Sequence, residues 1–567
     1  MKISLPSSLS LSLVFALSLP SNAWAEAAYH NAAKPIIDKQ GRTRVIVDFT
    51  DGARDAYPRE LLVNFDPKKD TQQPQVLALV TDYEQRYGFV REGLTTWVGA
   101  SVTAYLTASQ IEQLKADSNV KLLTDDEYQQ FSAPATPPPW PPSWTNGTAW
   151  EELNDWGRTA VNGKEVLPGS YRKVYIIDSG VAFHSDLSSV SQRVNVNCGT
   201  GGDCSGIATP SPSVTPPGIG VYSTVGCYAH ATHVAGIVGA SANGTAPRVG
   251  IYAGVNMVSI ALGQTQGVYN NAWIPCAFGG TNDYNLNGVT VSNIGFAFDF
   301  IAAQNQPTGP ISGTANIATL SLNGGKLGFT GGVAETNRSK LLAMVNPASS
   351  WHYFQGQWVQ WYYPGIFFTQ SAGNQNQNAC GQIGSNSAAF QTTPSPTGTA
   401  VDGIMVVGAI RQDGTAVSDL NGNLGPNFTL PEPRFSSATE PGSNFGNCVD
   451  IWAPGDFIYS TWGSGLNSTY STANYFGGQP NTYVPGTAPG SPSDPNPATL
   501  YQGLFGWQWL SGTSMAAPHV AAAAAYMADK YNLVTPIEIE QKIRDNWQYW
   551  GALDPQGYPV RIVYLPD

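Results

Sequence analysis

The stretch Gly512-Thr-Ser514-Met-Ala-Ala-Pro518-His519, followed by an alanine-rich run, decides the fold. The pattern indicates the start of a helix, in which Pro518 is tolerated because it falls in the first turn. Ser514 then lies at the amino end of the helix. There the helix dipole and the free N–H groups favour the negative charge that develops when a serine attacks a carbonyl. A serine that only caps the helix is the ordinary alternative.

A strand far upstream ends in a carboxylate. Residues Arg172-Lys-Val-Tyr-Ile-Ile177 form an apolar run that stops at Asp178-Ser-Gly180. In open parallel α/β sheets the carboxyl ends of the strands form the ligand crevice. We therefore expect Asp178 at a functional position, although an aspartate that only caps a turn is common.

Two of the six histidines lie in one helical stretch of small residues. This stretch is Gly226-Cys-Tyr-Ala-His230-Ala-Thr-His233-Val-Ala-Gly236. Small side chains allow a helix to pack closely against its neighbours. Two histidines at this spacing could bind a metal, but the glutamate of an HExxH zinc site is absent, so we do not expect zinc here.

These three segments resemble the signatures of the subtilisin family of serine peptidases. The matching segments are Ile177-Asp-Ser-Gly-Val181, His230-Ala-Thr-His-Val-Ala-Gly236 and Gly512–His519. They follow one another in that family's order of Asp, His and Ser. The resemblance covers most of residues 165–550 and implies an α/β fold, with helices on both faces of a parallel sheet.

The resemblance also implies a role for each of the three residues. Asp178 orients His230 and supports its charge. His230 takes the proton from Ser514 Oγ and returns it to the leaving amine. His233 and His519 are then supporting residues. We expect no cofactor in this chemistry. Structural calcium is common in the family, but we identify no ligand loop for it.

A fourth segment, Ser371-Ala372-Gly373-Asn374, follows an apolar strand. An asparagine in a glycine turn is commonly turn chemistry alone. The resemblance implies that Asn374 supplies the side-chain amide of the oxyanion hole and that the three residues before it bind substrate. It likewise implies that Ser321-Leu322-Asn323-Gly324 pairs with an extended peptide by β-augmentation, with Asn323 departing from the family pattern.

The ends of the chain and its proline content predict the domain boundaries. Residues 1–25 combine Lys2, a short apolar run and Ala23-Trp-Ala25, which is typical of an export signal. The run is too short to span ~30 Å of hydrocarbon, so we expect a secreted or periplasmic protein without a membrane partner. Residues 134–145 are proline-rich and are predicted as a linker. They separate a module at 26–133 from a catalytic module at 146–567.

The first module is predicted to have the order βαββαβ, the ferredoxin-like split βαβ arrangement. The predicted elements are a strand at Leu61–Phe65, a helix over Val76–Tyr87, strands near Gly88–Leu94 and Val98–Leu106, a helix opened by the capping box Thr107-Ala-Ser-Gln110, and a strand at Val120–Leu123. The resemblance implies an inhibitor-type (I9) propeptide. It would guide folding, occupy the cleft and be removed by the enzyme itself between Asp126 and Ala133.

Six cysteines suit an oxidising compartment, and their number alone allows fifteen pairings. Their positions resemble the proteinase K-like and aqualysin-like branch of the family. That resemblance implies the pairs Cys227–Cys276 and Cys380–Cys448, which leaves Cys198 and Cys204 as the third pair. Long insertions near 264–290, 346–363 and 464–508 are expected to shape or cover the cleft.

Composition excludes several partners. The formal net charge is −12, so the chain has no general electrostatic attraction for nucleic acid or anionic membranes. We expect a monomer that acts on proteins or peptides and is inhibited by its own propeptide. The alternative is an inactive subtilisin-fold binding protein, which Ala231 in place of the family's glycine suggests. An α/β-hydrolase would need Gly-x-Ser-x-Gly and Ser before Asp and His, which this chain lacks.

Overall fold

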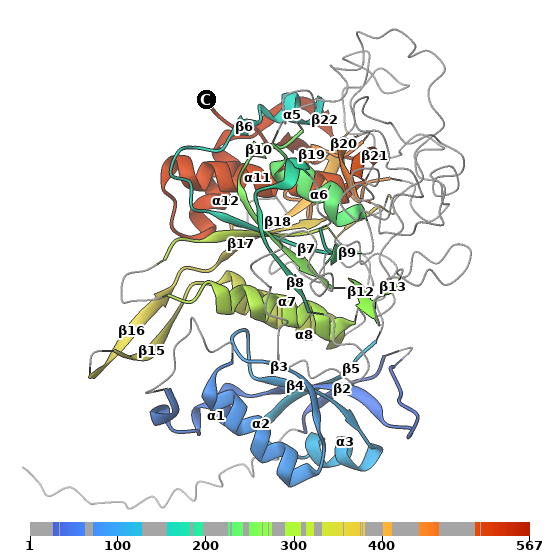
Figure 1. Cartoon of the computed structure of the whole chain (residues 1–567), viewed down its shortest axis with the longest axis vertical. Coiled ribbons are helices and arrows are strands. Elements are labelled where there is room, and N and C mark those ends of the chain that lie inside the picture. The colour runs from blue at the N-terminus through green and yellow to red at the C-terminus, as the bar shows by residue number, and fades with distance from the viewer. Residues whose placement is uncertain are drawn as a thin grey trace, which may run out of the picture.

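The structure is a computed structural model, in which two parts of the chain form separate sheets (Figure 1). It describes residues 26–32, 35–62, 72–127, 156–181, 185–196, 225–226, 229–241, 249–262, 265–269, 272–274, 290–307, 313–321, 332–354, 356–374, 376, 378–379, 401–410, 442–456, 458–463, 505–510 and 512–567. The predicted export signal and proline-rich linker lie outside these residues. None of the helices within these ranges is long and apolar enough to cross a membrane.

The small module is a five-stranded sheet covered on one face by helices. In chain order its elements are β1 Ala28–His30, β2 Thr43–Phe49, α1 Asp51–Asp55, a 3-10 turn Arg59–Leu62, α2 Pro74–Tyr87, β3 Arg91–Thr95, β4 Ser101–Leu106, α3 Ala108–Lys115 and β5 Val120–Asp125. The sheet order is β1-β5-β2-β4-β3. Strands β2 to β5 with α2 and α3 form the expected βαββαβ unit, and the capping box of Thr107 and Gln110 opens α3 as predicted.

The first strand of this unit was predicted wrongly. Leu61 and Leu62 belong to a 3-10 turn, and residues 63–65 lie outside the described part of the chain. The strand is Thr43–Phe49, whose residues are buried on both faces of the sheet. Val45 and Val47 face the module's own core, whereas Ile46 packs with residues of the large module. A strand buried on both faces lacks the polar alternation that marks a half-exposed strand.

The large module is built on a nine-stranded sheet in the order β22-β23-β19-β18-β17-β14-β7-β11-β8. Its strands are β7 Lys173–Asp178, β8 Val190–Asn195, β11 Asn256–Ala261, β14 Asn316–Leu320, β17 Ile366–Ser371, β18 Ile404–Ile410, β19 Ile451–Pro454, β22 Gln548–Leu553 and β23 Pro559–Ile562. Every neighbouring pair is parallel except the pair β22 and β23 at one edge. The predicted α/β fold is confirmed.

Helices cover both faces of this sheet. One face carries α5 Trp156–Val161, α6 Ala229–Gly239, α11 Thr513–Tyr531 and α12 Pro536–Asn546, and the other carries α7 Val291–Gln304 and α8 Gly332–Val345. Strand β7 shows the division, because Val174 and Ile176 belong to the first core while Tyr175 and Ile177 belong to the second. A strand buried on both faces reads as a continuous apolar run.

Helices α7 and α8 lie between the large sheet and the small module (Figure 1). Asp299 of α7 is 5% exposed, and its Oδ1 accepts hydrogen bonds from the backbone N–H groups of Thr96, Trp97 and Val98 at 2.9, 2.5 and 3.0 Å. Val98 was predicted to begin a strand, but it lies in the loop before β4, which begins at Ser101. The ring of Phe296 occupies the place where a side chain at Gly93 would lie, 2.2 Å from an added Cβ.

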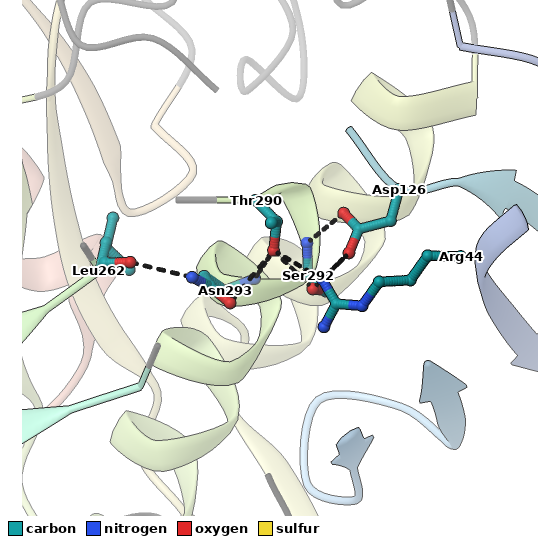
Figure 2. A network of polar contacts seen from close by, with 6 residues as sticks. All are labelled: Arg44, Asp126, Leu262, Thr290, Ser292 and Asn293. Atoms are coloured by element: carbon teal, nitrogen blue, oxygen red, sulfur yellow. Dashed lines mark hydrogen bonds and ion pairs between the residues drawn. The ribbon is translucent and has the colours of Figure 1, made fainter. Parts of the chain in front are cut away.

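A second contact joins the end of β5 to the amino end of α7 (Figure 2). Asp126 is fully buried and pairs with Arg44 at 2.7 Å. Its other partners are the backbone N–H of Ser292 at 3.2 Å and the hydroxyl of Ser292 at 2.7 Å. A carboxylate at this position satisfies free N–H groups of the helix and interacts favourably with its dipole. The small module thus caps a helix of the large module.

A third contact is a buried ion pair between the modules. Lys340 of α8 lies 2.8 Å from Asp48 of β2, and its side chain is only 4% exposed. Thr336 donates to the same carboxylate at 3.1 Å and lies 2.9 Å from the hydroxyl of Thr124. Because each charge is held by a specific partner, separating the modules would leave these groups to be solvated again.

A buried charge cluster fastens the amino ends of β18 and β19 to α12. Arg544 pairs with Glu540 at 2.6 Å and with Asp450 at 3.0 Å. Glu540 also accepts the backbone N–H groups of Asp402 and Gly403 at 2.9 and 2.7 Å. Glu540 is fully buried and the side chain of Asp450 is 11% exposed, so one guanidinium is the counter-charge for two poorly solvated carboxylates.

We expect Arg544→Met to lower the free energy of unfolding of the large module by about 3–5 kcal/mol, because it leaves two buried carboxylates without a counter-charge. Urea unfolding followed by circular dichroism measures the change. The matched control is Lys164→Met in the same module, which breaks a surface ion pair with Asp567 and should cost no more than about 1 kcal/mol. The double variant Arg544→Met/Glu540→Gln should recover part of the loss. Equal effects of Arg544→Met and Lys164→Met would contradict this role.

Candidate active site

Asp178 and His230 form a direct pair. Asp178 is the last residue of β7 and is 1% exposed. The Nδ1 atom of His230, in the first turn of α6, lies 2.9 Å from Asp178 Oδ2 and 3.0 Å from Oδ1. The backbone N–H of Ser179 donates to the same carboxylate at 2.6 Å. Because the carboxylate accepts the Nδ1 proton, the neutral imidazole keeps Nε2 as an acceptor.

The small residues of α6 let a strand approach it closely. A Cβ added at Gly236 would lie 2.1 Å from Ser460 Oγ and 2.3 Å from Thr461 Oγ1 of β20 Ile458–Gly463. These hydroxyls donate to the carbonyl groups of His233 and Thr232, both at 2.7 Å. His233 is fully buried, and its Nε2 lies 3.0 Å from the carbonyl oxygen of Ile458. His233 therefore fixes α6 against β20, as its expected supporting role requires.

Ser514 lies in the first turn of α11, with Gly512 as the N-cap. Its side chain is buried, and Oγ donates to the carbonyl oxygen of Ser321 at 2.8 Å. The backbone N–H of Ser514 is among the first N–H groups of the helix, so the helix contains no carbonyl four residues earlier that could accept it. Pro518 lies beyond the first turn, contrary to expectation. The N–H that proline lacks would have reached the carbonyl of Ser514, so that carbonyl loses its helical donor.

Asn374 is held by the residue before Ser514. Its Oδ1 accepts the backbone N–H of Thr513 at 2.9 Å and the hydroxyl of Thr513 at 2.8 Å. These two donors fix which end of the amide is oxygen and leave Nδ2 as the free donor end. Gly512, with φ +150°, has no side chain, and an added Cβ would lie 3.2 Å from this nitrogen. The positive φ favours glycine at this position, and a side chain would in addition crowd the amide of Asn374.

The strand order brings the predicted residues to one edge. Strands β17, β14 and β7 are neighbours in the sheet, and Asn374, Ser321 and Asp178 lie at or just beyond their carboxyl ends. The amino end of α11 contacts both Asn374 and Ser321, while His230 reaches Asp178 from α6. The edge expected to form the ligand crevice therefore gathers all four residues predicted to carry chemistry.

The predicted substrate-binding residues are described only in part. Ser321 lies just after β14, whereas Leu322, Asn323 and Gly324 lie outside the described residues. Ser371 ends β17, Ala372 donates to Val407, and Gly373 donates to the hydroxyl of Thr513 at 3.1 Å. The carbonyl groups of Ala372 and Gly373 accept from Asn444. Substrate binding by these residues stays a prediction, and their backbone contacts hold Asn374 in place.

Two features of this edge were not predicted from the sequence. Thr513 orients Asn374, and the carbonyl of Ser321 accepts the proton of Ser514. Thr513 directly precedes Ser514, which is the signal that could have drawn attention to it.

His519, predicted as a supporting residue, is buried, and burial lowers its pKa to about 4. It is therefore neutral near pH 7, with Nδ1 2.7 Å from the carbonyl oxygen of Met515.

The disulfide and metal predictions fall largely outside the described residues. Cys448 is buried and disulfide-bonded, whereas Cys198, Cys204, Cys227, Cys276 and Cys380 are not described. The backbone N–H of Ala379 donates to the carbonyl of Phe445 at 2.7 Å, which places the chain before Cys380 beside the chain before Cys448. Within the described ranges, no three His, Cys, Asp or Glu side chains gather as metal ligands, and structural calcium stays a prediction.

The chain is similar to known peptidases. It is 24% identical over 338 residues to "Alkaline serine exoprotease A" of Vibrio alginolyticus, which is 60% of this chain and 38% of that protein. It is 28% identical over 163 residues to "Subtilisin-like protease 2" of Trichophyton equinum, which is 29% of this chain and 30% of that protein. The matched regions thus span well under half of these relatives.

The fold is similar to that of fervidolysin from Fervidobacterium pennivorans, described as a keratinolytic enzyme related to subtilisin. The TM-score is 0.53 at 14% identity, covering 95% of this chain and 62% of that one. The model of the Subtilase family (Peptidase S8) matches residues 169–558, more than half of the chain. The matched region contains Asp178, His230, Asn374 and Ser514, and this protein belongs to the subtilase family.

Proposed function

We propose that this protein is a secreted serine endopeptidase, made as a zymogen, that cleaves proteins through an acyl-enzyme on Ser514. The observation that carries the proposal is the arrangement at the carboxyl edge of the sheet. A carboxylate is paired with His230 there, and an oriented amide lies beside the serine at the amino end of a buried helix. These are the groups that acyl transfer requires. The expected export signal and the disulfide of Cys448 support secretion.

His230 acts as the general base. Its Nδ1 proton is held by Asp178, so Nε2 is the atom that accepts the proton of Ser514. In the structure the hydroxyl of Ser514 donates to the carbonyl of Ser321. Proton transfer therefore requires this hydroxyl to exchange the carbonyl for His230 as its acceptor. Asp178, buried at the strand end, stabilises the imidazolium that forms.

Asn374 and the helix amino end stabilise the oxyanion. Attack on a peptide carbonyl moves negative charge onto its oxygen, which then needs donors that are already in place. Asn374 Nδ2 is one donor, because Thr513 occupies the oxygen end of the amide. The backbone N–H of Ser514 is the other, since no helical acceptor competes for it.

Ser514 should react with a fluorophosphonate, and Ser514→Ala should abolish both labelling and hydrolysis of protein substrates. Mass spectrometry of the labelled peptide identifies the residue. An Asp178→Asn variant is the graded control, since it keeps the serine but favours the wrong imidazole tautomer and should lower kcat by about 10⁴-fold. A native protein that does not react would favour the inactive binding protein.

Asn374→Ala should lower kcat by about 10²- to 10³-fold with little change in KM. This is the loss of kcat that follows removal of the oxyanion-hole asparagine in subtilisin. Thr513→Val should lower kcat by roughly tenfold, because the amide keeps the N–H of Thr513 but loses its hydroxyl. Thr513→Ser restores the hydroxyl and should restore kcat. Steady-state kinetics on a peptide substrate separates the two parameters. If Thr513→Ser were as slow as Thr513→Val, the positioning role would be wrong.

We propose further that the module at 26–133 is the propeptide and inhibits the enzyme until it leaves. Its contacts with α7 and α8 support this assignment, because they bury two carboxylates, Asp299 and Asp48, against donors of the other module. Asp126 is fully buried, and the carbonyl of Glu127 accepts the N–H of Val291 at 3.3 Å. Self-cleavage between Asp126 and Ala133 would therefore fall after Glu127.

Ser514→Ala should accumulate with residues 26–133 attached, and sequencing of the active enzyme should give an N-terminus between Tyr128 and Ala133. In the active background, Asp299→Ala should shorten the lag before activity appears by at least about tenfold, since three buried N–H groups lose their acceptor. Glu165→Ala, an exposed acidic residue of the same module, is the control and should leave the lag unchanged. An unchanged lag in Asp299→Ala would contradict the inhibitory role of the contact.

A further inference from the structure

A two-stranded ribbon interrupts the large module between α8 and β17. It consists of β15 Ala348–Phe354 and β16 Gln357–Tyr363, paired antiparallel, and it projects from the body of the molecule (Figure 1). The ribbon enters β17 at its amino end, whereas Asn374 follows the carboxyl end of that strand. The insertion at 346–363 therefore does not cover the catalytic edge, contrary to the expectation for it. A different role must account for it.

One face of the ribbon is anchored to the body. Trp361 and Tyr363, which alternate along β16, are 6% and 4% exposed. The hydroxyl of Tyr363 donates to the carbonyl of Met344 at the end of α8, at 2.6 Å. The aromatic side chains of this inner face are thus explained by packing.

The opposite face carries aromatic side chains that packing does not explain. Tyr353 pairs directly with Trp358, and Ser349 pairs with Tyr362, so by strand alternation these residues share one face. Tyr353 and Tyr362 are 39% and 36% exposed. The rings of Tyr353 and Trp358 meet edge to face, with centroids 5.5 Å apart. Gln360, exposed between the two aromatic positions, donates to Ser349 at 2.7 Å. We call Ser349, Tyr353, Trp358, Gln360 and Tyr362 the outer face.

The chemistry of the outer face is uncharged. No Asp, Glu, Lys or Arg occurs in the sequence between Lys340 and Asp402. The face offers aromatic rings with amide and hydroxyl groups beside them. A charged ligand would find no counter-charge here, whereas an apolar lipid surface would have to bury the amide and hydroxyl groups unpaired.

The size of the outer face also selects its ligand. A ribbon of strands this short is about 24 Å long and about 10 Å wide, or roughly 240 Å². A stable protein partner buries about 800 Å² on each side. A short run of sugar rings fits the smaller area. The apolar faces of sugars stack on aromatic rings, and their hydroxyls bond to amides. Tyrosine and tryptophan also lose little conformational entropy when they bind.

We propose that the outer face is a binding site for an uncharged polysaccharide, separate from the peptidase site. It holds the enzyme on a glycan-containing matrix while the catalytic edge, at the other end of β17, remains free for protein. Ring stacking supplies most of the affinity, and Gln360 orients the sugar hydroxyls.

The test is sedimentation of the full-length Ser514→Ala protein with insoluble cellulose and chitin, and affinity electrophoresis in gels that contain hydroxyethylcellulose or alginate. Saturable binding to at least one neutral polysaccharide is expected, unchanged by added salt. Trp358→Ala and Tyr362→Ala should each weaken it by about 3- to 10-fold, and the double variant by about 10- to 100-fold. Tyr362→Phe, which keeps the ring, should bind nearly as well as the parent.

Tyr549→Ala is the matched control, because Tyr549 is 55% exposed on a distant strand and should not affect binding. In the Ser514 background, the ribbon variants should keep the parent's kcat/KM on a soluble peptide, which also shows that they fold. Absence of saturable binding to every neutral polysaccharide would overturn the proposal. Binding to alginate alone, or binding that the double variant retains, would overturn it as well.

Discussion

The parallel pairing of β7, β14 and β17 is the constraint on which the rest depends. Parallel strands end at a common edge, so three segments distant in sequence deliver Asp178, Ser321 and Asn374 to one line. Helix α11 then begins over that line, and its first turn binds Ser321 and Asn374 through Ser514 and Thr513. The polar groups at the site are thus fixed by a sheet whose strands are buried on both faces.

The small module depends on the same sheet indirectly. Helices α7 and α8 pack on one face of the sheet. They contact the small module through the N–H of Ser292, the carboxylate of Asp299 and the ammonium group of Lys340. Asn293 of α7 donates to the carbonyl of Leu262 (Figure 2). The N–H of Leu262 in turn donates to the carbonyl of Asp178. The surface that binds the module and the strand end that carries Asp178 are therefore parts of one hydrogen-bonded framework.

Sequence reasoning succeeded where structure is local. The capping box of Thr107 and Gln110, the strand before Asp178 and the helix after Ser514 each follow from neighbouring residues. It failed for Thr43–Phe49, where burial on both faces removes the alternation that marks a strand. It also missed the acceptor role of Ser321 and the amide that Thr513 orients, because those partners meet only when the sheet forms. The insertion at 346–363 was expected to shape or cover the cleft, but it precedes the amino end of β17, a position that follows from the strand order and not from local sequence.

Asp299 binds the small module only through peptide N–H groups. Every non-proline residue carries that group, so the contact does not depend on which side chains occupy positions 96–98. Thr96 and Val98 are nevertheless buried at this contact, and the hydroxyl of Thr96 accepts the N–H of Gln73. Only side chains that keep this packing fit there, and a proline at any of the three positions would remove one of the bonds. A loop of the same backbone shape, with side chains that fit this contact, would therefore keep the anchor. The constraint falls on Gly93, where any side chain would strike Phe296.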